Sequence, residues 1–264
     1  MSLSERLDWR GQPLGEVPES LRGNPGIKHL GLSKTGLASL PDWLWSLQQL
    51  ESLNLSENEL TTISEGIGHL QQLRMLDLGH NRLTQLPEAL GALTGLSEYL
   101  YLSENQLSTF PAALGHLRRL KYLGFTHNLL TELPEAIGDL ASLRELRLYD
   151  NRLARLPAGI GRLSQLRELH LHDNALVELP ESVGDLSELR SLDLRNNQLE
   201  QLPNRVAELA NLGFLDLRAN RFRKLPEALA RLPRLEKLDL RWNPLEAVPP
   251  WFGTLEQRGC AVLL

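Results

Sequence analysis

Cysteine is almost missing from this sequence, which has Cys260 alone among its 264 residues. One thiol excludes an intrachain disulfide and the cysteine-flanked caps of many extracellular repeat proteins, so we expect a reducing compartment, the cytoplasm. Long apolar runs are missing too. No run approaches the ~18 residues of a membrane-spanning helix, and the first ten residues are too charged for the apolar core of a signal peptide. We therefore expect no membrane partner.

A surplus of positive charge is also absent. The formal net charge is −5 and the sequence pI is about 5.8, which argues against nucleic acid as the main partner. Arginine outnumbers lysine by 23 to 5, a ratio consistent with a GC-rich, bacterial genome. No linker, low-complexity tract or shift in composition marks a boundary, so we expect a single domain over residues 1–264.

What the sequence has instead is one motif repeated at a fixed period. The stretch from Leu143 to Leu153 follows the pattern L-x-x-L-x-L-x-x-N-x-L. Its asparagine recurs every 23 residues, apart from one interval of 24. This pattern predicts a solenoid whose repeats each supply a short strand and a turn, and in which no repeat buries its apolar face alone. The copies of the asparagine are Asn58, Asn81, Asn105, Asn128, Asn151, Asn174, Asn197, Asn220 and Asn243.

The asparagines are predicted to point inward with the leucines. A buried amide must satisfy its carbonyl and its NH₂ group, and the nearest partners are the loop backbones of its own and the adjacent coil. We expect a structural ladder of asparagines that holds the coils in register. Thr35 occupies the same position one repeat earlier and can form only part of this set.

The single domain divides into three predicted parts. Residues 1–26 form a degenerate N-terminal repeat or cap, in which Leu7, Trp9 and Leu14 fall on strand positions if Gln12 replaces the asparagine. Residues 27–249 form about ten 23-residue repeats, and residues 250–264 form a C-terminal cap. The cap closes on an apolar strand for which we prefer the register that turns Cys260, Val262 and Leu264 inward. The oligomeric state is left open, and a bare apolar edge would permit association there.

The second half of each repeat reads x-x-L-P-x-x-[LIV], often followed by glycine, with Ser64 in the one place where the proline is missing. Proline suits the first turn of a helix, and the glycine soon ends it. We therefore expect short helical or 3-10 segments. One repeat has an extra residue between Leu96 and Leu100, which predicts a strand bulge that turns Tyr99 toward the open side of the sheet.

The full repeat, as it runs from Leu133 and Pro134 to Leu153, resembles the intracellular 23-residue leucine-rich repeats of plant Ras-group-related proteins, Ras scaffolds, Roco GTPases and bacterial effectors. The resemblance covers roughly residues 7–255. It implies an α/β leucine-rich repeat solenoid, a horseshoe with a concave parallel β-sheet and short helical or 3-10 segments on the convex side. It also implies a non-enzymatic protein-binding surface.

Catalytic and cofactor motifs are not found. The sequence has no phosphate-binding loop, nucleophile elbow or zinc-protease helix motif, so we predict no enzyme activity and no cofactor. His170 and His172 are spaced to face one side of a strand, but a third metal ligand is not evident, and we assign no metal.

Function is therefore expected at the variable positions that flank the strand leucines, because side chains alternate along a strand. We predict a scaffold that binds a protein or peptide on the concave face. The alternative is a recognition module of a larger signalling or effector enzyme, a kinase, GTPase or ubiquitin ligase. The predicted partner-binding residues are Tyr99, Tyr101, Tyr122, Tyr149, His170, His172, Arg195, Phe214, Arg218, Arg241 and Trp242.

Overall fold

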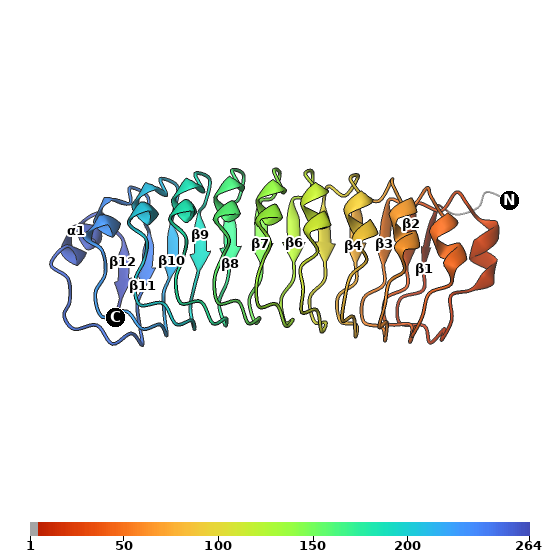
Figure 1. The fold of residues 1–264 in the computed structure, drawn as a ribbon, viewed down its shortest axis with the longest axis horizontal. Helices are drawn as coiled ribbons and strands as arrows, with labels where there is room; N and C mark the ends of the chain where they lie inside the picture. The colour runs from red at the N-terminus through yellow and green to blue at the C-terminus, as the bar shows by residue number, and fades with distance from the viewer. Residues whose placement is uncertain (1–4) are drawn as a thin grey trace. The chain divides into compact units, whose positions relative to one another are not determined.

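The computed structural model describes residues 5–264, in which each repeat supplies one three-residue strand and, in nearly every case, one five-residue 3-10 helix (Figure 1). Residues 1–4, the start of the predicted N-terminal cap, lie outside the described residues. The chain forms two compact units, of which the first ends at Leu129 and the second begins at Leu130.

In the first unit, six parallel strands follow one another in chain order, each hydrogen-bonded to the next. The register places leucine opposite leucine, as in the pair Leu30 and Leu53. The strands are β1 (Arg6–Asp8), β2 (His29–Gly31), β3 (Ser52–Asn54), β4 (Met75–Asp77), β5 (Tyr99–Tyr101) and β6 (Tyr122–Gly124). The 3-10 helices are η1 (Glu19–Gly23), η2 (Asp42–Ser46), η3 (Glu65–His69), η4 (Glu88–Ala92) and η5 (Ala112–His116).

The second unit repeats this plan and ends in an α-helix and a last strand. Its strands are β7 (Glu145–Arg147), β8 (Glu168–His170), β9 (Ser191–Asp193), β10 (Phe214–Asp216), β11 (Lys237–Asp239) and β12 (Ala261–Leu263). Its helices are η6 (Glu135–Asp139), η7 (Ala158–Arg162), η8 (Glu181–Asp185), η9 (Asn204–Glu208), η10 (Glu227–Arg231) and α1 (Phe252–Gln257). Parallel strands joined by short 3-10 segments confirm the predicted fold class.

The core consists of the repeated leucines. Leu76 and Leu78 in the fourth repeat, for example, have no exposed surface. From η2 onward, each 3-10 helix packs on the next one within its unit, as each strand pairs with the next. The prolines stand one residue before the 3-10 helix and not in its first turn. Pro87 has φ −70° and ψ 144°, and Ser64, which replaces the proline, has the same extended backbone.

The asparagines lie inside the coils, where their amides are bonded to backbone groups. In Asn81, Nδ2 donates to the carbonyl oxygens of Leu55 and Leu78, both at 3.0 Å, and Oδ1 accepts from the N–H of Leu60 at 3.0 Å. Leu55 and Leu60 belong to the preceding coil, so each amide ties two coils together. At the degenerate N-terminal repeat, Gln12 is exposed and does not take this place.

Two local expectations are corrected. The extra residue before β5 forms a bend at Glu98, and β5 itself runs in register with β4, so the strand has no bulge. At the C-terminus, Cys260 is buried and Val262 lies opposite Leu238, as predicted, but Leu264 is 56% exposed. Leu264 follows the last residue of β12 and lies past its pairing with β11.

Candidate binding face

The middle residue of each strand points into the core, and its neighbours point the other way. The open face is defined here as the side formed by the first and last residues of each strand and by the second residue after the strand. In β4, for instance, Leu76 is fully buried while Met75 and Asp77 are partly exposed. Because side chains alternate along a strand, the variable positions beside the strand leucines lie on the open face, as predicted.

Three tyrosines form a cluster on the open face of the first unit. The ring centroids of Tyr99 and Tyr101 are 4.5 Å apart, and those of Tyr101 and Tyr122 are 4.7 Å apart with an edge-to-face geometry. Burial and the nearby charge of Asp77 raise the pKa of Tyr99, which keeps its hydroxyl protonated. A side chain at Gly124 would come within 3.2 Å of Tyr101 and 3.1 Å of Tyr122, so this glycine leaves room for the rings.

On the second unit, Tyr149 and His172 stack face to face, with ring centroids 4.2 Å apart and planes inclined by 11°. His172 Nδ1 lies 2.6 Å from Asp173, and its Nε2 lies 3.3 Å from a guanidinium nitrogen of Arg195. A guanidinium can only donate, so Nε2 is the acceptor and the proton of a neutral His172 sits on Nδ1, toward Asp173. Tyr149 and His172 thus form a fixed aromatic platform.

Arg218 and Arg241, each two residues after the end of a strand and not on it as expected, are paired with aspartates of their own repeats. Arg218 donates to both carboxylate oxygens of Asp216, at 3.0 Å or less, and Arg241 does the same to Asp239. Asp239 has no exposed side-chain surface, and the Lys237 ammonium is 3.8 Å away. Burial alone would raise the pKa of Asp239, but hydrogen bonds from Arg241 hold it below its ordinary value. The arginines are therefore held in fixed positions on the face.

Two large apolar side chains remain exposed on or beside this face. Phe214, the first residue of β10, is 49% exposed and lines a hollow of about 240 Å³ together with Asp193 and Asp216. Trp242 is 71% exposed. It was expected on a strand, but it lies in the turn after β11 with φ +63°. The guanidinium carbon of Arg241 is 5.4 Å from its ring centroid, a cation–π distance.

The left-handed turn that holds Trp242 recurs before each asparagine. Nine residues with positive φ precede the nine asparagines, among them His80, Asp150 and Asn196, and Lys34 has the same conformation before Thr35. Asparagine, aspartate and histidine tolerate this conformation better than bulky residues do. Tryptophan is the bulkiest side chain found there, and the core does not need it.

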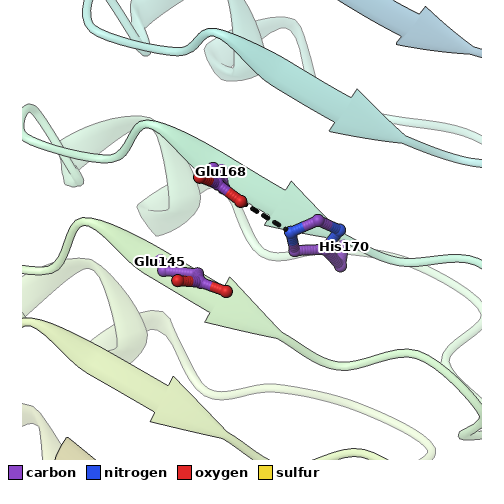
Figure 2. Close-up of side chains that lie close together, drawn as sticks. All are labelled: Glu145, Glu168 and His170. Carbon is purple, nitrogen blue, oxygen red and sulfur yellow. Dashed lines mark hydrogen bonds and ion pairs between the residues drawn. The ribbon is translucent and has the colours of Figure 1, made fainter.

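His170 and His172 do not act as a pair. His172 contacts Tyr149, Asp173 and Arg195, whereas His170 Nε2 lies 3.2 Å from Glu168. Glu145 on the neighbouring strand also lies close, with a carboxylate oxygen within 4.8 Å of a ring nitrogen of His170 (Figure 2). The sequence reading missed Glu145 and Glu168 as neighbours of this histidine, although the 23-residue register between strands was sufficient to find them.

Comparisons with known proteins agree on the fold. A family model described as a leucine-rich repeat region matches residues 99–176 and 158–242, which together are more than half of the chain. Leucine-rich repeat models also match residues 25–83, 52–107 and 234–255. No curated protein matches the sequence. Among residues 5–264, no helix has the length and apolar character needed to cross a membrane.

Solved structures give the same result. A leucine-rich repeat protein from Leptospira interrogans is 32% identical, with a TM-score of 0.88, over 97% of this chain and 65% of that one. A plant peptide hormone receptor, RGFR1 in complex with RGF2, is 28% identical, with a TM-score of 0.74, over 94% of this chain and 45% of that one. An internalin from Listeria monocytogenes is 21% identical, with a TM-score of 0.80, over 94% of this chain and 70% of that one. At this identity the likeness shows the fold alone.

Proposed function

Because the chain belongs to the leucine-rich repeat family, we propose that it is a non-enzymatic interaction module that binds a protein or peptide on the open face of its sheet. Repeat scaffolds present side chains from successive strands on one continuous surface. The plant receptor RGFR1, which shares this fold, was solved in complex with RGF2. A partner of the same general kind, a protein or peptide, is proposed here.

The observation that carries the proposal is the exposure of Phe214 and Trp242, at 49% and 71%, in a chain whose other large apolar side chains are mostly buried. Aromatic residues and arginine are the side chains that most often dominate binding energy at interfaces. Arg218 and Arg241 lie beside Trp242, with their guanidinium carbons 5.9 Å and 5.4 Å from its ring centroid. An aromatic surface held in place by arginines meets a partner with little loss of conformational entropy.

The tyrosine cluster of the first unit and the Tyr149–His172 platform of the second are proposed as further contact points. Tyrosine and histidine offer an apolar ring and a polar atom, which suits a partly wet interface. Each group is tested by its own variant, Tyr122→Ala or Tyr149→Ala. Either change should leave stability within about 1 kcal/mol, as surface substitutions usually do, while partner affinity falls.

The experiment begins with peptide-display selection on the intact chain. Affinities of the selected peptides are then measured for the double variant Phe214→Ala with Trp242→Ala. We expect a loss of at least ~2 kcal/mol, the usual size of a binding hot spot. The matched control is Val177→Ala with Val248→Ala, which removes two exposed apolar side chains, at 42% and 63%, away from the strands. Equal affinity for both double variants would reject this face as the site.

The alternative is that the chain is the recognition module of a larger signalling or effector enzyme. This chain spans 65% of the length of the Leptospira protein and 45% of that of the plant receptor, which motivates the alternative. A reading frame that continues into a catalytic domain would favour it. The cytoplasmic setting, the single domain and association through the edge of β12 also remain predictions. Co-fractionation tests the cytoplasmic setting. The oligomeric state of the purified chain tests association through the edge of β12.

A further inference from the structure

The open face of the second unit carries three side chains that could ligate a metal ion, of which His170 is also among the predicted partner-binding residues. Glu168 and His170 are the first and last residues of β8, so they share a face. Glu145 begins β7 and is the register partner of Glu168. One ligand atom from each of the three lies within 4.8 Å of the other two. Figure 2 shows Glu168 and His170 on one strand, joined by a dashed line, and Glu145 on the neighbouring strand.

Two glutamates directly opposite each other on neighbouring strands repel, because both carry negative charge at neutral pH. Arg147 offsets part of this charge, since its Nε lies 2.5 Å from Oε1 of Glu145. That contact fixes one oxygen of Glu145 and leaves the other available. Ligating carboxylates commonly have such a hydrogen-bond partner outside the metal shell. The remaining charge of the two glutamates favours a cation between them and His170.

We propose that Glu145, Glu168 and His170 bind a divalent transition-metal ion, with zinc as the best match. Imidazole nitrogen and carboxylate oxygen are ordinary zinc ligands, while magnesium and calcium prefer oxygen alone. Tetrahedral ligands at zinc distances are ~3.3 Å apart. The separation of 3.2 Å between His170 Nε2 and Glu168 Oε2 already meets this value. The ligand oxygen of Glu145 lies within 4.8 Å of these two atoms, so binding of zinc requires this side chain to move closer.

The surroundings suit a three-ligand site that completes its shell with water. The side chains of Glu145 and His170 are 23% and 21% exposed, and that of Glu168 is 49% exposed. The ion is therefore reachable from solvent. The ligands come from two hydrogen-bonded strands in fixed register, so little order has to be created on binding. Sequence spacing alone showed His170 beside His172, but His172 is already engaged by Asp173 and Arg195.

The test is a zinc titration of the full chain, purified without a histidine tag and treated with a chelator. Calorimetry should show a zinc site, and cobalt at the same site should give a visible absorption band. His170→Gln, Glu168→Gln and Glu145→Gln should each weaken zinc binding by at least about tenfold, since even loss of an outer-shell partner has this effect. Circular dichroism confirms that each variant is folded.

The matched control is His127→Gln. His127 Nδ1 lies 3.4 Å from Glu104, which gives a histidine–glutamate pair on the first unit outside the three-residue group. This variant should bind zinc as the parent chain does. Unchanged affinity in His170→Gln would overturn the site, as would an equal loss in His127→Gln. Magnesium binding that competes with zinc at similar concentration would overturn the assignment to a transition metal.

Discussion

The backbone N–H of Leu199 donates a hydrogen bond to Oδ1 of Asn220, one coil further along, at 3.0 Å. The Nδ2 of Asn220 returns to the preceding coil by donating to the carbonyl oxygen of Leu194 at 2.9 Å, and also donates to that of Leu217 at 3.1 Å. One side chain therefore bonds backbone groups of two coils. The N–H of Leu199 depends on this amide, whereas the carbonyl oxygens of Leu194 and Leu217 also accept from the side chains of Asn197 and Asn243.

Replacing Asn220 with alanine should destabilise the chain by about 1–3 kcal/mol, the cost of leaving the buried N–H of Leu199 unsatisfied. Asn220 is 6% exposed. The matched control is Asn204→Ala, at an exposed position of the same unit at the start of η9, where we expect almost no change. Chemical denaturation of both variants measures the difference. Equal denaturation midpoints for the two variants would mean that water replaces the amide as the hydrogen-bond partner of the backbone.

A second prediction concerns the close packing of the 3-10 helices. A Cβ atom at Gly91 in η4 would collide with the carbonyl oxygen of Ala113 in η5, which is backbone and cannot rotate away. Gly91→Ala should therefore cost about 1–3 kcal/mol, as overpacking does. Gly23→Ala is the control, because nothing lies within 4 Å of its added carbon. Thermal unfolding should separate the two variants. If Gly91→Ala melts like Gly23→Ala, the coils are able to move apart.

The parts of the fold that repeat every 23 residues could be predicted from sequence. Leucine and asparagine keep their positions in each copy, so strand alternation and the need to satisfy buried amides were enough to place them inside. The irregular parts were harder. The extra residue before Tyr99 is absorbed by a bend at Glu98, because the ladder to β4 holds the strand in register.

Site geometry was only partly accessible. Which side of the sheet Tyr101 or Phe214 would face followed from alternation. The pairing of Arg218 with Asp216, or of His170 with Glu168 instead of His172, depends on side-chain rotamers that no spacing specifies. Trp242 was placed on a strand because the leucine pattern does not show where the strand ends and the turn with positive φ begins.

A third prediction concerns pH. Burial opposes the charge of Asp239, but hydrogen bonds from Arg241 hold its pKa below the ordinary value. A carboxyl group whose pKa is lowered by folding stabilises the protein above its unfolded pKa of about 4, and loses that contribution as the pH falls through the folded pKa. Asp239→Asn should therefore destabilise by about 1–3 kcal/mol near neutral pH.

As the pH falls from about 4 through the lowered folded pKa, this difference from the parent chain should shrink, because the carboxyl group becomes protonated first in the unfolded chain and then in the folded protein. Urea denaturation at several pH values measures it. Asp8→Asn serves as control, since Asp8 has a side chain 41% exposed and lies 3.6 Å from Arg10. Exposed pairs of this kind contribute little. A deficit in Asp239→Asn that stays constant across the pH range would assign the loss to packing and not to the charge.

The last prediction concerns the C-terminal cap. Cys260 is 4% exposed, and burial raises the pKa of its thiol, so at about pH 8 little of it is the reactive thiolate. We expect slow reaction with a thiol-specific reagent in the native protein and fast reaction in guanidinium chloride. The native rate then reports how often α1 and β12 open away from the coil.

The control is Ala261→Cys in a Cys260→Ser background, one residue further along β12 and exposed, which should react quickly in the native state. Because neighbouring residues of a strand face opposite sides, the two thiols must differ in rate if Val262 lies opposite Leu238. Similar rates would mean that β12 does not hold this register in solution.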